Sequence, residues 1–282
     1  MSRIVYVNGS YVPEEQAKVS VFDRAFLFGD AVYEVTAVLG RQLIDFEPHL
    51  ARLDRSLAEI SLAAPLSHDA LRALHKELIA RNQVNEGIVY LEITRGFADR
   101  DFAYPENTAP TVVAFTQSRP LIANPYAETG VKVITIPDIR WKRRDIKSTA
   151  MLGQAMGKQE AKLKGAYEAW MVEDGHVTEG TSSTAFILDE DGVVRTQPLG
   201  YHILPGVTRR AVLRLAASEG VRLEERPFSV AEALSAREAF MSAASAFVLP
   251  VVEIDGRKIG NGRPGPVARA FRALYIDEAR KG

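Results

Sequence analysis

One stretch in the middle of the chain limits its possible folds more than any other, because it places a lysine and a glutamate around a single helix. A basic segment ends at Lys147, directly after the apolar Ile146. A run rich in Ala, Leu, Met, Gln and Lys then predicts a helix over 151–164. The apolar run 167–172 predicts a strand, and Glu179 follows in a small-residue segment that we interpret as a loop. One strand–helix–strand unit would therefore hold both an amine and a carboxylate.

Residue type alone does not indicate a function for these two side chains, because most lysines and loop glutamates are solvated surface groups. The motifs around them are more specific. Residues 145–148 read Asp-Ile-Lys-Ser, and residues 177–183 read Val-Thr-Glu-Gly-Thr-Ser-Ser. The two motifs, in this order, resemble those of the fold type IV (class IV) pyridoxal-phosphate aminotransferases, and among these the D-amino acid transaminases. The resemblance extends over about 4–258 of the chain.

The resemblance implies a mixed α/β (α+β) fold of two domains, the larger with a barrel-like β core. We expect a small N-terminal α/β domain over 1–117, where alternation through 32–38 predicts a half-buried strand. The segment 118–130 has prolines, a terminal glycine and no period, so we interpret it as an interdomain linker. The large cofactor-binding domain would occupy 131–282 and include a strand over 184–188.

The resemblance also implies pyridoxal 5′-phosphate as cofactor. Lys147 would form a Schiff base with its aldehyde and afterwards move a proton between substrate and cofactor. Glu179 would pair with the ring nitrogen and keep the ring an electron sink. An unprotonated amine is favoured by desolvation among cations. Four cations precede the lysine, but the sequence does not show which way they face: Arg140, Lys142, Arg143 and Arg144.

Three segments match the elements with which the family binds the cofactor phosphate. Arg52 stands in a His-x-x-Arg-Leu setting, although an arginine beside an apolar helical stripe is more often a surface group. Val207 and Thr208 follow a glycine at a predicted helix start, where backbone amides favour anions, although a structural cap explains the same residues. In the third segment alanines replace the expected threonines, so we expect Ser242 or Ser245 to supply the hydroxyl.

The family's D-amino acid transaminases hold the substrate carboxylate with a tyrosine, an arginine and a histidine. Tyr33 and Arg100 match the first two, and Phe102 stands at the histidine position. Without the resemblance, Tyr33 would be interpreted as a core aromatic and Arg100 as a loop surface charge. Because this histidine is missing, the expected substrate range extends to amines that lack a carboxylate.

Composition excludes several other classes of protein. The chain of 282 residues has no cysteine, which excludes disulfides and thiolate metal sites. Its 35 basic and 36 acidic residues give a net charge of -1, which argues against a nucleic-acid partner. No run approaches the ~20 apolar residues of a membrane span, and no apolar signal region is seen, so we expect a cytoplasmic protein. The histidines lack a metal-ligand spacing, and we expect two of them, His68 and His75, to be solvated.

We therefore predict transamination between D-amino acids of the D-alanine type and α-keto acids such as pyruvate and 2-oxoglutarate, in a homodimer. Three activities of the same fold remain open: branched-chain L-amino acid aminotransferase, (R)-amine transaminase and aminodeoxychorismate lyase. A catalytically silent binding protein is the alternative from another class, and the intact pair of Lys147 and Glu179 argues against it.

Overall fold

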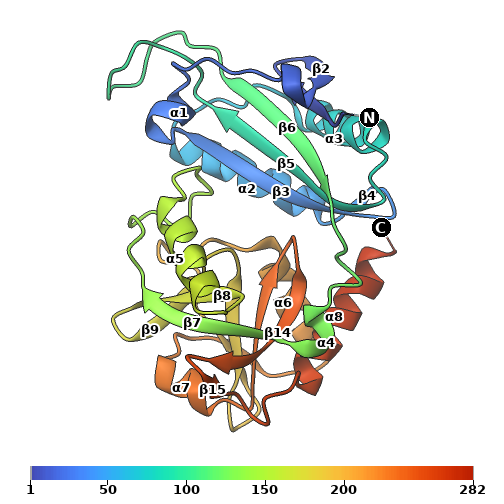
Figure 1. Ribbon diagram of the computed structural model, residues 1–282, viewed down its shortest axis with the longest axis vertical. Helices are drawn as coiled ribbons and strands as arrows, with labels where there is room; N and C mark the ends of the chain where they lie inside the picture. Colours follow the sequence, from blue (N-terminus) through green and yellow to red (C-terminus); the bar gives the residue numbers. More distant parts are fainter. Residues whose placement is uncertain (1, 282) are drawn as a thin grey trace. The chain divides into compact units, whose positions relative to one another are not determined.

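The computed structural model describes residues 2–281, which divide into two compact units. The first unit comprises residues 2–120 together with 146–150, and the second comprises 121–145 together with 151–281. In Figure 1 the first unit is mostly blue and green, and the second runs from green to red. The short segment that carries Lys147 therefore packs with the first unit, although its neighbours in the sequence belong to the second.

The first unit is built on a six-stranded antiparallel sheet with the strand order β2-β1-β6-β5-β3-β4. Its strands are β1 (Ile4–Val7), β2 (Ser10–Pro13), β3 (Ala31–Leu39), β4 (Gln42–Leu43), β5 (Glu86–Thr94) and β6 (Thr111–Ser118). Its helical segments are η1 (Glu14–Gln16), α1 (Arg24–Phe28), α2 (Phe46–Glu59) and α3 (His68–Arg81). Helices α2 and α3 lie against one face of the sheet (Figure 1).

The strand pattern of this sheet follows from the sequence. Asn8 and Gly9 form the predicted two-residue hairpin turn, with φ of 45° and 92°. Along β3, Val32 is fully buried on the helix side, whereas Tyr33 is only partly buried on the opposite face. By the same alternation Glu34 lies on the helix side, where a charged group needs a partner.

The core of the first unit lies between the sheet and its two long helices. Leu50, Leu53 and Leu57 of α2 are buried there, as their helical spacing predicts. The expectation for His75 is wrong. This side chain is buried, packs on the ring of Phe46, and has its Nδ1 2.7 Å from a backbone carbonyl oxygen one turn earlier.

Helix α1 has no counterpart among the predicted elements. The Asp23 side chain accepts a hydrogen bond of 2.9 Å from the Ala25 N–H, and Gly29 ends the helix with φ of 67°. A capping aspartate and a left-handed glycine are usual signals of helix ends. Five residues between them are too few to show a helical period.

The second unit is built on a nine-stranded mixed sheet with the order β12-β11-β10-β13-β14-β7-β8-β9, and β15 pairs with β14. Its strands are β7 (Val131–Pro137), β8 (Glu168–Glu173), β9 (His176–Gly180), β10 (Thr184–Leu188), β11 (Val194–Thr196), β12 (Leu223–Glu225), β13 (Glu238–Ala243), β14 (Phe247–Ile254) and β15 (Arg257–Lys258). Its helices are α4 (Tyr126–Thr129), α5 (Leu152–Leu163), α6 (Val207–Ser218), α7 (Val230–Ser235) and α8 (Pro266–Ala279). β7 runs parallel to β8, which α5 makes possible as the crossover between them.

The large sheet curls, because a short loop joins two strands that are far apart in its order. β9 is an edge strand, and β13, β14, β7 and β8 lie between it and β10. Only residues 181–183 connect β9 to β10, and the Gly180 N–H donates to the Ser183 carbonyl oxygen at 2.8 Å. The expected mixed α/β class with a barrel-like β core is therefore confirmed.

Buried aromatic rings pack helix α8 and the segment before α7 against this sheet. Phe186 and Phe240 stack with centroids 4.9 Å apart, and Phe271 of α8 packs 5.8 Å from Phe240. Trp170 of β8 packs 6.2 Å from Phe228. Each of these rings is almost completely buried, which fixes the strands that present the polar residues described below. No helix within residues 2–281 combines the length and apolarity needed to cross a membrane.

Candidate functional site

The residues predicted to form the site fall into two groups, one in each unit. The first unit contains Tyr33, Arg52, Arg100 and Lys147, and the second contains Glu179, Val207, Thr208, Ser242 and Ser245.

Lys147 lies beside strand β3. The Tyr33 N–H donates to the Lys147 carbonyl oxygen at 3.0 Å, and the Lys147 N–H donates to Ser56 Oγ at 3.3 Å. The preceding Ile146 is buried in the core of the first unit. The lysine side chain is partly buried, and its Nζ lies 4.0 Å from the centroid of the Tyr33 ring. The backbone is therefore fixed on both sides of the lysine, and its amine lies over an aromatic face.

Arg52 is part of a buried cluster of charges under β3. Its Nε and Nη2 donate to the two carboxylate oxygens of Glu34 at 2.8 and 2.7 Å, and His49 Nδ1 lies 2.7 Å from Glu34 Oε2. The arginine is 9 % exposed, so the interpretation as a surface group is wrong. Although burial opposes ionisation, Arg52 and His49 lower the pKa of Glu34, and burial lowers the pKa of His49. The guanidinium is thus held as a cation in one orientation.

The face of the small sheet opposite its helices carries a row of aromatic rings. Tyr33 stacks on Tyr90 with centroids 5.5 Å apart, and Tyr90 stacks on Phe115 at 4.8 Å. The Tyr90 hydroxyl donates to Glu92 at 2.8 Å. Burial raises the pKa of both Tyr90 and Glu92. Tyr33 is therefore a member of an ordered stack, and it contacts Lys147 through its ring.

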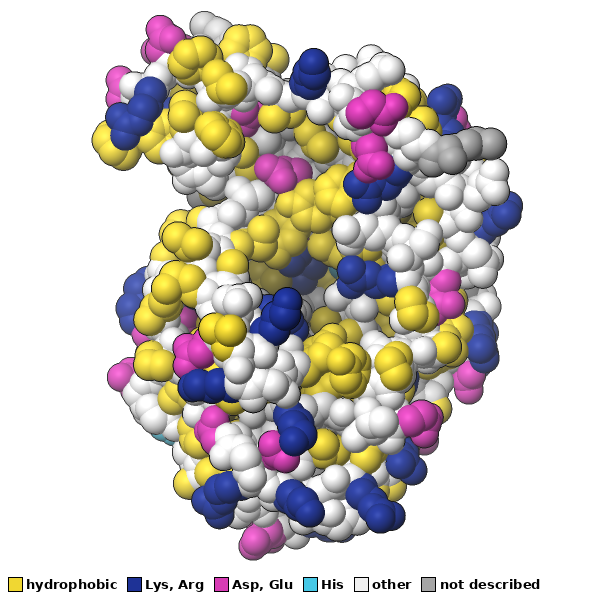
Figure 2. All heavy atoms as spheres, viewed as in Figure 1, with side chains coloured by type: hydrophobic (Ala, Val, Ile, Leu, Met, Phe, Trp, Pro, Cys, Tyr) yellow, Lys and Arg dark blue, Asp and Glu magenta, His cyan; other side chains and the backbone are white. Residues whose placement is uncertain are grey.

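Arg100 is exposed on the loop between β5 and β6. Its guanidinium carbon lies 5.5 Å from the Phe28 centroid and 5.3 Å from that of Phe102. Phe102 is 77 % exposed, and Phe26 and Phe97 nearby in the sequence are also exposed. Figure 2 shows hydrophobic side chains gathered over α1 and this loop. The observed contacts of Arg100 are with rings, so its role toward a carboxylate stays a prediction.

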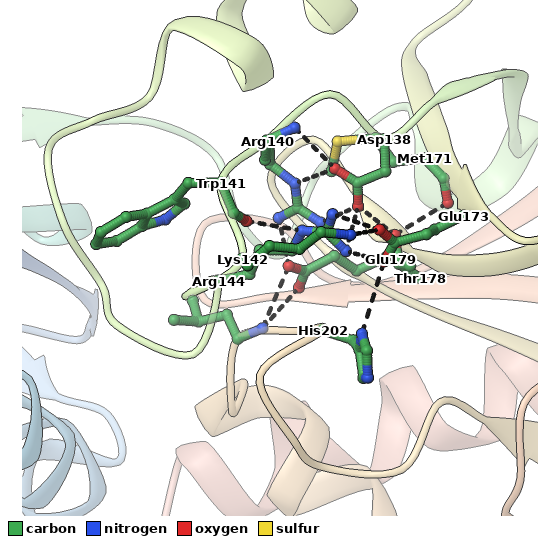
Figure 3. A network of polar contacts seen from close by, with 11 residues as sticks. Asp138, Arg140, Trp141, Lys142, Arg144, Met171, Glu173, Thr178, Glu179 and His202 are labelled. Carbon is green, nitrogen blue, oxygen red and sulfur yellow. Dashed lines mark hydrogen bonds and ion pairs between the residues drawn. The ribbon is translucent and has the colours of Figure 1, made fainter.

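Glu179 lies within strand β9, so its expected position in a loop is wrong. Its carboxylate is buried and accepts a bond of 2.5 Å from Arg140 Nη1 (Figure 3). The Leu204 N–H lies 3.2 Å from each of the two carboxylate oxygens. Burial raises the pKa of Glu179, and Arg140 and the Leu204 amide act in the opposite direction. The strand places the side chain, and a guanidinium and an amide fix its direction.

The start of helix α6 has the properties of an anion site. Gly206 is its N-cap and provides no side-chain cap bond. Thr208 Oγ1 and Ser242 Oγ are buried, and neither has a hydrogen-bond partner within the described residues. Ser242 is opposite Thr184 in the sheet, and Thr184 Oγ1 would be 2.8 Å from a Cβ at Gly206, two residues before Thr208. Unpaired hydroxyls at an uncapped helix start fit a group such as phosphate, which supplies acceptor oxygens.

The remaining predicted phosphate residues take different positions. Val207 is the first residue of α6 and is buried, so its backbone amide belongs to this helix start. Ser245 lies in the turn between β13 and β14 and is partly buried. The structure thus places Val207, Thr208 and Ser242 around one helix start, and Ser245 at the end of the hairpin that carries Ser242.

A third buried carboxylate, Glu168 of β8, is not among the predicted residues. It accepts hydrogen bonds from the Thr181 hydroxyl at 3.0 Å, the Ser182 N–H at 2.7 Å and the Ser183 hydroxyl at 2.5 Å. It therefore anchors the loop that follows Glu179. The sequence contains one signal for this role, because Glu168 begins a strongly apolar run. A glutamate in a buried strand needs polar partners.

Comparison with known proteins finds relatives that match nearly the whole chain. The sequence matches the amino-transferase class IV family over residues 31–254. It is 40% identical over 267 residues to a D-alanine aminotransferase of Bacillus licheniformis, covering 94% of this chain and 93% of that protein. It is 37% identical over 271 residues to a D-alanine aminotransferase of Staphylococcus aureus, covering 95% of each.

The structure also superposes on a solved aminotransferase. A branched-chain aminotransferase of the thermophilic archaeon Thermoproteus uzoniensis, solved with norvaline, matches with a TM-score of 0.88 and 26% identity. The match covers 99% of this chain and 95% of that chain. Since the family match spans most of the chain and the relatives match it along nearly their whole length, this chain belongs to the class IV aminotransferases.

Proposed function

We propose that this aminotransferase uses pyridoxal 5′-phosphate to transfer the amino group of D-amino acids of the D-alanine type to α-keto acids such as pyruvate and 2-oxoglutarate. The single observation that carries the substrate class is the 40% identity over 94% of the chain to a D-alanine aminotransferase. The pair of orphan hydroxyls at the start of α6 supports a phosphate-bearing cofactor independently of that identity.

Each predicted residue then has a definite task. The cofactor, when bound, supplies an aldehyde that accepts an amine and a ring that withdraws electrons. Lys147 Nζ provides the amine that would hold the cofactor, and once freed it would move a proton between the substrate α-carbon and C4′ of the cofactor. Glu179 provides a carboxylate directed by Arg140 and Leu204 to pair with the ring nitrogen.

The phosphate would be bound by groups of three kinds. Arg52 provides a guanidinium oriented by Glu34, Val207 provides a backbone amide, and Thr208 and Ser242 provide hydroxyls that have no partner within the described residues. Ser245, in the turn of the hairpin that carries Ser242, would be a further donor. An anion that bonds to buried hydroxyls removes the cost of leaving them unsatisfied.

The substrate carboxylate would contact the hydroxyl of Tyr33 and the guanidinium of Arg100. Phe102 supplies no donor at the position where the family's D-amino acid transaminases have a histidine, so the site should hold carboxylates with one bond fewer. A homodimer and a cytoplasmic location stay predictions.

The decisive experiment is a donor panel with both enantiomers of each amino acid and with 2-oxoglutarate and pyruvate as acceptors. Turnover of D-alanine well above that of L-alanine and L-leucine is expected, and preference for L-leucine would reject the proposed substrate class in favour of branched-chain transamination. Pyruvate release without an acceptor would indicate a lyase, and turnover of (R)-1-phenylethylamine an amine transaminase.

The Lys147→Ala variant tests the chemistry itself. It should lose the yellow colour that pyridoxal phosphate gives the protein and all measurable transamination. The control is Lys142→Ala, which removes a 79 % exposed side chain in the same segment and should leave both unchanged. Full turnover by Lys147→Ala would refute the assignment of the amine.

A further inference from the structure

The segment before Lys147 holds a chain of alternating charges that ends at Glu179 (Figure 3). Arg144 Nη1 lies 2.7 Å from Glu173 and 3.2 Å from Asp138 Oδ2. Asp138 accepts bonds from Arg140 Nε at 2.9 Å and from Arg140 Nη2 at 2.7 Å. Arg140 Nη1 then donates to Glu179 at 2.5 Å. Two of the four cations in this segment therefore face the interior, and both are linked to the same aspartate.

The chain is buried where it approaches Glu179. The side chains of Asp138, Arg140 and Glu179 are 0, 5 and 7 % exposed. Asp138 takes one edge of the guanidinium with two bonds, which leaves Nη1 directed at Glu179. The stem of Arg140 passes Gly153 of α5, where a Cβ would lie 3.1 Å from Arg140 Cγ. The orientation of the guanidinium is therefore set before it reaches the glutamate.

Few groups decide the charge of Glu179. Arg140 is the cation in contact with it, Asp138 is the anion whose field opposes its ionisation, and the Leu204 amide donates to it. Asp138 is itself held by the Thr178 hydroxyl at 2.7 Å and by Arg144. Lys142 and His202 face Glu173 at the far end of the chain of charges. Without Arg140, Glu179 would be a buried acid beside a second carboxylate, and it would take up a proton.

We propose that Arg140, held in place by Asp138, is the positioning residue that keeps Glu179 ionised and directed. The consequence for catalysis rests on the proposed function, in which an ionised Glu179 pairs with a ring nitrogen. The charge of Glu179 is a property of the protein alone, so this charge and its consequence for catalysis can be tested separately.

The first test uses the cofactor-free protein and infrared spectroscopy. Arg140→Met should show the carbonyl stretch of a protonated buried carboxylic acid near neutral pH, and the double variant Arg140→Met/Glu179→Gln should lack it. Arg195→Met removes another buried arginine that is paired with Asp189, and it should show no such band. Absence of the Glu179-dependent band in Arg140→Met would overturn the proposal.

The pH dependence of unfolding gives a second readout of the same charge. A carboxyl whose pKa is raised in the folded state binds more protons when folded, so stability falls as pH rises from the ordinary glutamate range through the folded pKa. Arg140→Met should extend this fall to higher pH, and adding Glu179→Gln should abolish the extension. A pH profile for Arg140→Met that is insensitive to Glu179→Gln would contradict the proposal.

The Arg140→Lys variant separates charge from direction, and it also serves if Arg140→Met does not fold. Lysine keeps the cation but cannot bond to Asp138 and Glu179 through one rigid fork. The carboxylic-acid band should stay absent, while kcat for D-alanine falls by at least about tenfold, with a smaller change in KM. Wild-type kcat in Arg140→Lys would refute the positioning role. If the wild-type protein binds no pyridoxal phosphate while the infrared result holds, the proposed function fails and the charge inference stands.

Discussion

Replacing Glu34 by glutamine should destabilise the first unit far more than a usual charge substitution. Glu34 is buried, and it binds Arg52 through two bonds of 2.8 and 2.7 Å and His49 through one of 2.7 Å. Glutamine has nearly the same shape, so it leaves no cavity. It removes, however, the negative charge that faces the buried Arg52 guanidinium.

The size of the effect follows from the geometry. Breaking a buried ion pair by removing one partner costs about 3–5 kcal/mol, because the remaining charge stays desolvated. Glutamine still offers one acceptor oxygen to Arg52, so we expect the lower end of this range, about 3 kcal/mol of unfolding free energy. The exposed pair of Glu47 and Arg72 is the matched control, and Glu47→Gln should cost less than about 1 kcal/mol.

The pKa of Glu34 determines how the stability difference between wild type and Glu34→Gln changes with pH. The folded pKa of Glu34 is lowered by Arg52 and His49, so the folded state binds fewer protons than the unfolded state once pH falls below the ordinary glutamate value of about 4.5. Stability from Glu34 is fully present above that pH and is lost as pH falls toward the folded pKa. The difference between wild type and Glu34→Gln should therefore be constant near neutral pH and shrink in acid.

The assay is urea denaturation of the cofactor-free protein at a series of pH values, followed by the fluorescence of a probe placed in the first unit. Equal m-values for wild type and variant are needed for the comparison. A loss below about 1 kcal/mol at neutral pH, or a difference that does not narrow in acid, would refute the view of Glu34 as an ionised partner of Arg52.

Three further predictions concern the proposed site. Thr208→Val and Ser242→Ala should each weaken pyridoxal phosphate binding by about tenfold in equilibrium dialysis, and neither should lower the stability of the cofactor-free protein. Each variant removes a buried hydroxyl for which the described residues provide no partner. Unchanged affinity would place the phosphate elsewhere. Arg100→Ala should raise KM for D-alanine and pyruvate by at least about tenfold in steady-state kinetics, and an unchanged KM would mean that another cation binds the carboxylate. Glu179→Gln should still bind the cofactor but slow single-turnover transamination by about a hundredfold, and a wild-type rate would exclude the role of Glu179 as partner of the ring nitrogen.

Much of the fold could be predicted from periodicity, since regular burial leaves a regular pattern. The strand expected over 184–188 coincides with β10, and the helix expected over 151–164 differs from α5 by one residue at each end. The failures occur where the pattern is too short or is broken by a polar residue. Helix α1 has five residues, and Glu179 lies in a strand of mixed polarity that was interpreted as a loop.

The polar contacts of the site could not be predicted in the same way. Glu34 and Arg52 are on different elements, and nothing in a single sequence pairs them. One signal was present, because strand alternation places Glu34 on the same face as the buried Val32. The irregular segment before Lys147 gave no signal at all, since without a period the sequence cannot distinguish the buried Arg140 from the exposed Lys142.

Each unit contains an arginine that a carboxylate orients through two hydrogen bonds. This shared arrangement gives Glu34 and Asp138 a function, although neither is predicted to contact a ligand. Glu34 binds Nε and Nη2 of Arg52, and Asp138 binds the same two atoms of Arg140. A free arginine side chain loses about 2 kcal/mol of rotamer entropy when it is fixed. In this protein the arginine is already ordered in the folded state, so its loss of rotamer entropy does not weaken ligand binding. The two carboxylates also supply the counter-charge that allows a guanidinium to be buried at all. Removing Glu34 or Asp138 should therefore weaken binding and stability together, whereas removing the orphan hydroxyls of Thr208 and Ser242 should weaken binding alone.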